Sequence, residues 1–130
     1  MKTKLKYVIL FVEDVAAASR FYAAAFDLMP GFIADGGDYG EMQSGETTLS
    51  FSSQHLMRHL GKNPGRPDAA VPVFEIAFEV DDVSGALSRA LQAGATLVQD
   101  VKEESWGQTT SYVADPDGYL VEICSPVGAS

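Results

Sequence analysis

The pattern of apolar and polar positions predicts the same elements twice along this chain of 130 residues. The run from Tyr7 to Asp14 is echoed by the run from Glu75 to Asp82, with one offset at both ends (75 − 7 = 68 and 82 − 14 = 68). Each run predicts a strand that ends at an aspartate able to cap a helix, and after Asp14 the apolar residues Val15, Ala18, Tyr22 and Ala25 are spaced by three and four. We therefore expect a duplicated unit, with a ligand cleft at the seam between its copies.

Turn residues divide each copy further. In the first copy, Pro30-Gly31 is expected to end the helix, and residues 32–53 predict three short strands. The second copy predicts a strand over 73–80, a helix that Gly94 ends, and strands around 96–101, 106–114 and 119–124. The whole chain then forms one domain, with modules at about 1–54 and 73–126 and a connection at about 55–72.

Charge and cysteine content restrict the partners and the compartment. The formal net charge of −9 argues against binding to nucleic acid or to an anionic membrane surface, because phosphate contacts need clustered Lys and Arg. No stretch is long and apolar enough to cross a bilayer. The single cysteine, Cys124, cannot form an internal disulfide, which is typical of a reducing compartment. We expect a cytoplasmic protein.

The segment Asp115-Pro116-Asp117-Gly118, a hairpin turn signal, is followed by Tyr119-Leu120-Val121-Glu122. Together with the duplicated unit and Phe21-Tyr22 in its first helix, this segment resembles the vicinal oxygen chelate superfamily of glyoxalase I, bleomycin-resistance proteins and extradiol dioxygenases. The resemblance covers essentially the whole chain. It implies an α+β fold of two βαβββ modules that form a curled mixed sheet, or half-barrel, completed by a homodimer. It does not by itself imply a reaction.

The resemblance also implies where a metal would bind, namely on the first and last strands of each module. The matching residues here are Tyr7, Glu75, Glu122 and Leu49, or Ser50 if the alignment of the first module is one residue off. A divalent metal needs three or four nitrogen, oxygen or sulfur ligands. Glu75 and Glu122 are the candidate metal ligands, but the full ligand set is absent, so no cofactor is assigned beyond a possible divalent metal.

Glu75 and Glu122 are also the candidate catalytic residues. Two carboxylates in one cleft could share a proton, with one acting as a base beside a carbonyl group, or they could hold a cationic ligand. On the strand over 106–114, alternate residues share one face. Ligand contacts are expected from Tyr7, Phe32, Leu49, Phe51, Trp106, Gln108 and Tyr112.

His55 and His59 stand four residues apart, the spacing of metal-binding pairs on one helix face. They lie in the connection between the modules, away from the matched cleft positions, and are expected to be surface residues. Cys124 has no histidine near it in sequence and is expected to be a packed thiol.

These observations predict a small-molecule binding protein that resembles glyoxalases and bleomycin-resistance proteins. The first candidate ligand is a flat, partly cationic aromatic molecule. The alternative is a metal-dependent lyase or isomerase resembling lactoylglutathione lyase. A dioxygenase fits less well, because the chain offers no match to the two histidines and one carboxylate of iron oxygenases.

Overall fold

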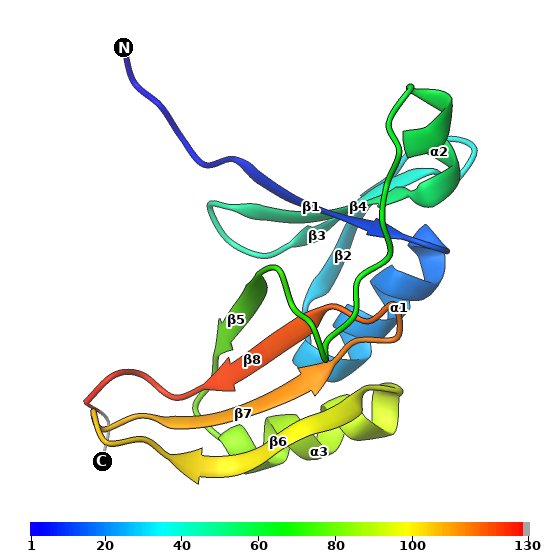
Figure 1. Cartoon of the computed structure of the whole chain (residues 1–130). Coiled ribbons are helices and arrows are strands. Elements are labelled where there is room, and N and C mark those ends of the chain that lie inside the picture. Colours follow the sequence, from blue (N-terminus) through cyan, green and yellow to red (C-terminus); the bar gives the residue numbers. More distant parts are fainter. Residues whose placement is uncertain (129–130) are drawn as a thin grey trace. The chain divides into compact units, whose positions relative to one another are not determined.

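The chain folds as two βαβββ modules, each a four-stranded mixed sheet (Figure 1). The structure is a computed structural model that describes residues 1–128. Contacts divide the chain into two compact units, of which unit 1 contains Met1–Ala23 and Asp27–Gly65. Unit 2 contains Ala24–Phe26 and the residues from Arg66 onward. The α+β fold of two βαβββ modules predicted from the sequence is confirmed.

Unit 1 holds the first module apart from residues 24–26 at the end of its helix, with strand order β1-β4-β3-β2. Strands β1 and β4 pair in parallel, and the other neighbours pair antiparallel. The elements are β1 (Tyr7–Val12), α1 (Val15–Phe26), β2 (Met29–Ile33), β3 (Tyr39–Gln43), β4 (Thr48–Ser53) and α2 (Gln54–His59).

Unit 2 repeats this topology with strand order β5-β8-β7-β6, and β5 pairs in parallel with β8. Figure 1 shows α3 running along one side of this sheet. The elements are β5 (Glu75–Glu79), α3 (Val83–Ala93), β6 (Thr96–Glu103), β7 (Thr109–Ala114) and β8 (Leu120–Cys124).

The predicted helix starts are confirmed by their caps. Asp14 accepts the Ala17 N–H at 3.1 Å, and Asp82 accepts the Gly85 N–H at 3.0 Å, so each carboxylate satisfies a donor of the first turn. The predicted end of α1 at Pro30-Gly31 is wrong. The helix ends at Phe26 because Asp27 adopts the left-handed conformation (φ 58°), and Pro30-Gly31 lies inside β2.

Each sheet packs one face against a helix. In unit 2, Val113, Val121 and Ile123 are fully buried on the face that α3 covers with its own apolar residues, Val83, Ala86, Leu87 and Ala90. In unit 1, Tyr22 of α1 stacks on Phe51 of β4 with ring centroids 5.5 Å apart. Successive strand residues alternate between faces. We call the opposite side of each sheet its helix-free face.

The turn between β7 and β8 is held by one carboxylate. Asp115 Oδ1 accepts backbone N–H groups from Asp117, Gly118 and Tyr119 at 2.9–3.0 Å. Gly118 completes the turn at φ 107°, a conformation that favours glycine. The turn therefore sets where β8 begins and which of its residues face the helix.

No helix in residues 1–128 is long and apolar enough to cross a membrane.

Gly118→Ala should destabilise unit 2 by about 2 kcal/mol, because its φ is left-handed and an added Cβ would lie 2.6 Å from the Pro67 carbonyl oxygen. Chemical denaturation measures the change. Gly45, the turn glycine before β4, provides a matched control: its φ is 104° but nothing lies within 4 Å of an added Cβ. Gly45→Ala should therefore cost less, and equal losses in the two variants would contradict the role of the Pro67 contact.

Candidate functional site

The parallel pairing of β5 with β8 brings together two carboxylates that are 47 residues apart in sequence (122 − 75 = 47). Glu122 is the register partner of Ala77, which lies two residues after Glu75 on β5. Residues two apart on a strand share a face, so Glu75 and Glu122 both lie on the helix-free face of unit 2. Val121 and Ile123, on either side of Glu122, point into the core.

Tyr112 on β7 joins the two carboxylates. It is the register partner of Glu122, and its hydroxyl donates a hydrogen bond to Glu122 Oε2 at 3.0 Å. Burial raises the pKa of Tyr112 far above its usual value of 10.0, and the neighbouring charges of Glu122 and Glu75 raise it further. The hydroxyl therefore stays protonated at neutral pH and serves as a hydrogen-bond donor between two acidic side chains.

Cys124 and Glu79 extend this cluster along the same face. Glu79 is the register partner of Cys124 on β5. Burial raises the pKa of the Cys124 thiol, and the charges of Glu122 and Glu79 act in the same direction. A protonated, buried thiol is a poor nucleophile and a poor metal ligand. Glu79 was not predicted from the sequence as a site residue, although its spacing of four from Glu75 places both on one strand face.

The carboxylates of Glu75, Glu79 and Glu122 have no basic partner within the described part of unit 2. No Lys, Arg or His among its described residues lies within ion-pair distance of them, and Lys102 pairs with a different carboxylate, Glu104, at 3.2 Å. Their negative charge is therefore not neutralised locally. A site of this kind attracts cations.

The donor set of unit 2 does not by itself fit a resident divalent metal. Glu75 and Glu122 offer carboxylate oxygens, while Tyr112 and Cys124 remain protonated. No group of three or more His, Cys, Asp or Glu side chains suited to a metal occurs among residues 1–128. A metal held by Glu75 and Glu122 would need further ligands.

Trp106 and Gln108 do not lie on a strand, contrary to the predicted strand over 106–114. The strand β7 begins at Thr109, and Trp106 lies in the turn that joins β6 to β7. The Trp106 indole N–H donates to Gln108 Oε1 at 2.7 Å, and Gln108 Nε2 donates to the Ser125 carbonyl at 2.9 Å. These hydrogen bonds fasten the turn to the segment after β8, and Trp106 remains 56% exposed.

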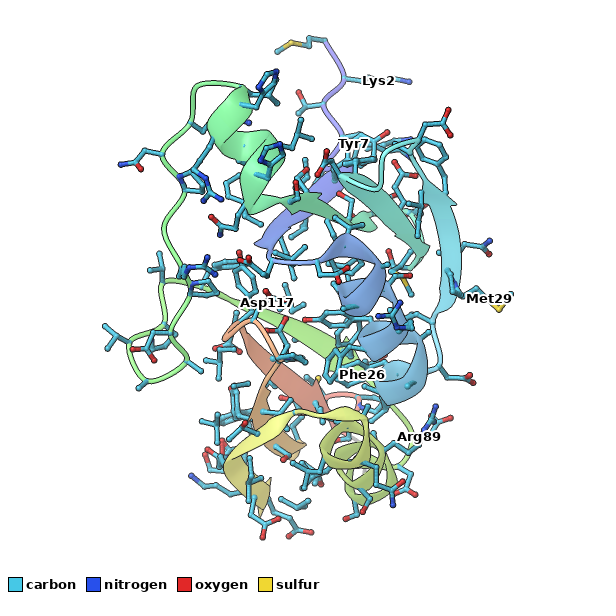
Figure 2. The ribbon with its side chains drawn as sticks, turned by 90° about the vertical axis from the view of Figure 1, so that its right-hand side faces the viewer. Lys2, Tyr7, Phe26, Met29, Arg89 and Asp117 are labelled. Carbon is cyan, nitrogen blue, oxygen red and sulfur yellow. The ribbon has the colours of Figure 1, made fainter. Side chains whose placement is uncertain are left out.

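Unit 1 carries its own polar cluster on the helix-free face. The Tyr39 hydroxyl donates to Glu41 Oε2 at 2.8 Å. Burial raises the pKa of Tyr39, Ser50 lowers it, and the nearby Glu41 and Tyr7 raise it. Tyr7 lies at the start of β1 (Figure 2), and it is 45% exposed. Glu41 was not predicted from the sequence as a site residue, although polar residues alternate along β3.

Leu49 and Phe51 lie on the helix-covered face of unit 1, so neither points to the helix-free face. Leu49 is buried, and Phe51 is fully buried against Tyr22. The register shows why: Ile9 pairs with Ser50, and Ala77, which follows Ile9 by the repeat offset (77 − 9 = 68), pairs with Glu122, so Ser50 is the counterpart of Glu122. Phe32 on β2 is 59% exposed, with its ring centroid 6.4 Å from that of Tyr39.

The chain belongs to the Glyoxalase/Bleomycin resistance protein/Dioxygenase superfamily, which it matches over residues 4–123. This family covers both modules and agrees with the duplicated fold and with the turn before Glu122.

Two curated relatives and one solved structure illustrate the likeness. An uncharacterized protein of Mycobacterium bovis is 30% identical over 122 residues, which are 91% of this chain and 80% of that protein. A virulence protein of Salmonella typhimurium is 28% identical over 130 residues, covering 92% of this chain and 82% of the relative. The crystal structure of a glyoxalase-related enzyme from Fulvimarina pelagi superposes with a TM-score of 0.82 at 26% identity, covering 95% of this chain and 88% of the other.

Tyr112→Phe should reduce the loss of stability at alkaline pH. A tyrosine whose pKa is raised in the folded state stabilises the protein below the ordinary pKa of 10.0, and this contribution is lost as the pH rises through the folded-state value. Between these two values the unfolded chain releases the proton first, so stability falls with pH. Denaturation midpoints measured from pH 8 to 11 should fall less steeply for the variant than for the wild type, and parallel curves would contradict this assignment.

Proposed function

We propose that this protein binds a small organic ligand that carries a positive charge, and that the ligand contacts the helix-free face of unit 2. The observation that supports this proposal is the grouping of Glu75 and Glu122 around the protonated Tyr112, without a basic partner in the described part of that unit. The side chain of Glu122 is partly buried. A charge pair formed there is less screened than one at the surface.

An aromatic ligand is favoured over an aliphatic one by two aromatic side chains of unit 2. The Tyr112 ring belongs to the cluster, and the Trp106 ring is exposed and fixed at its indole nitrogen. Rings of this kind stack on flat ligands and attract cations through their faces. Bleomycin-like glycopeptides and cationic heteroaromatic compounds are therefore the first ligands to test.

A glyoxalase-like lyase or isomerase is the alternative function. A carboxylate that acts as a base, with the protonated Tyr112 beside it as a donor, is an arrangement suited to removing a proton next to a carbonyl group. Glu75 is the carboxylate for that role, because Glu122 already accepts the Tyr112 hydrogen bond. The hemithioacetal of methylglyoxal and glutathione is the substrate that tests this alternative.

We also infer a homodimer in a reducing, cytoplasmic compartment. The outer strands of each sheet, β1 and β2 in unit 1 and β5 and β6 in unit 2, carry backbone groups that a second copy could cover. The compartment follows from the one cysteine of the sequence, Cys124, which is buried.

Glu75→Gln and Glu122→Gln should each weaken binding of a cationic heteroaromatic ligand about tenfold, since each removes one negative charge while keeping the side-chain shape. Quenching of the single tryptophan, Trp106, measures the affinity. Wild-type affinity should fall as salt is added, because the attraction is electrostatic.

The control is Glu46→Gln, which removes the same charge from an exposed turn of unit 1 and should leave the affinity unchanged. An equal loss in the control would mean that only the net charge matters. Salt-independent binding of an anionic thioester, with metal-dependent turnover that Glu75→Gln abolishes, would replace the binding proposal with the lyase.

Sedimentation at micromolar concentration should give about twice the mass of one chain, 13.9 kDa. The expected cause is burial of strand edges and exposed apolar residues in a twofold interface. A single species of monomer mass across a wide concentration range would contradict the dimer.

A further inference from the structure

We propose that His55 and His59 form a two-imidazole site for a late first-row divalent cation, with Cu²⁺ bound most tightly, on the exposed side of α2. Both histidines lie outside the cluster of unit 2, and the proposed ligand site does not use them. The proposal is therefore independent of the proposed function.

The backbone of α2 fixes the spacing of the two side chains. Ser53 caps the helix by accepting the Leu56 N–H at 2.9 Å, and Asp38 Oδ1 accepts the Ser53 hydroxyl at 2.6 Å. At the other end, the Leu60 N–H bonds to the Leu56 carbonyl at 2.9 Å. His55 and His59 thus stand one helical turn apart, a spacing at which Cβ atoms are about 5–6 Å apart.

Burial decides which side of α2 faces outward. Gln54 and Met57 are buried at 3% and 4% exposure, whereas His55 and His59 are both exposed. Gln54 is tied further by a hydrogen bond from its Nε2 to the Gly65 carbonyl at 3.2 Å. The helix therefore cannot turn its histidines inward without exposing Met57, and both imidazoles remain open to solvent.

The chemistry of the pair selects the cation. Imidazole nitrogens suit Cu²⁺, Ni²⁺ and Zn²⁺, and affinity rises along the first row to a maximum at Cu²⁺. Two imidazoles on one helix face bind one ion together, and water completes its coordination. Arg58 lies between them and its charge opposes the cation, while the net charge of −9 for the whole chain favours it.

The test is titration of metal-free protein without a histidine tag with CuCl₂, followed by calorimetry and electron paramagnetic resonance. We expect one ion bound with the hyperfine pattern of two nitrogen ligands. His55→Ala and His59→Ala should each weaken binding at least tenfold and remove one nitrogen from the spectrum. Circular dichroism and the unfolding midpoint establish that each variant is folded.

The matched control is the double variant His55→Ala/Arg58→His, which keeps two histidines but makes them adjacent, about 100° apart around the helix. It should bind no better than His55→Ala, although it also lacks the Arg58 charge. Glu75→Gln/Glu122→Gln should bind Cu²⁺ as the wild type does. Wild-type affinity in either single histidine variant or in the adjacent-histidine variant would overturn the proposal, as would loss of the site in the double glutamate variant.

Discussion

The parallel register of β5 against β8 is the constraint on which the site of unit 2 depends. Val121 and Ile123 are fully buried against α3, so the hydrophobic effect fixes which residues of β8 face the helix. A slip of one residue would bury Glu122 beneath α3 and expose both apolar neighbours, because side chains alternate along a strand. Burying an unpaired charge costs several kcal/mol, so core packing also determines where Glu122 points.

The same register places protonated side chains beside the carboxylates of the site. Glu75, Glu79 and Glu122 share one face, and their fields help to keep both Tyr112 and Cys124 protonated. The donors of the cluster are thus neutral, and its charges are all negative. Such a surface lacks the fixed cations that would hold a carboxylate or phosphate of a substrate. This asymmetry is the physical reason for preferring a cationic ligand to an anionic thioester.

Much of the fold was predictable because the duplication is visible in the sequence, where the strand, capping aspartate and helix recur with an offset of 68. The match of Leu49 to Glu122 failed for a local reason. It assumed that Gly45 and Gly118 stand equally far from the following strands, but two residues separate Gly45 from β4, and only Tyr119 separates Gly118 from β8. The matched pair is Ser50 and Glu122, with an offset of 72 (122 − 50 = 72). Trp106 was misplaced similarly, because Gly107 adopts φ 86° and delays β7 to Thr109.

The two units share the same strand register, but they carry different side chains at matching positions. Register places Glu41 where unit 2 has Tyr112, Ser50 where it has Glu122, and Tyr7 where it has Glu75. A tyrosine hydroxyl still donates to a glutamate in each unit, but in unit 1 both residues lie on β3, and in unit 2 the bond crosses from β7 to β8. Unit 1 therefore retains one carboxylate at these three positions and unit 2 retains two, with Glu79 beside them. Like charges that remain unpaired oppose folding, so their concentration in unit 2 does not serve stability, and it supports the proposal of a cationic ligand.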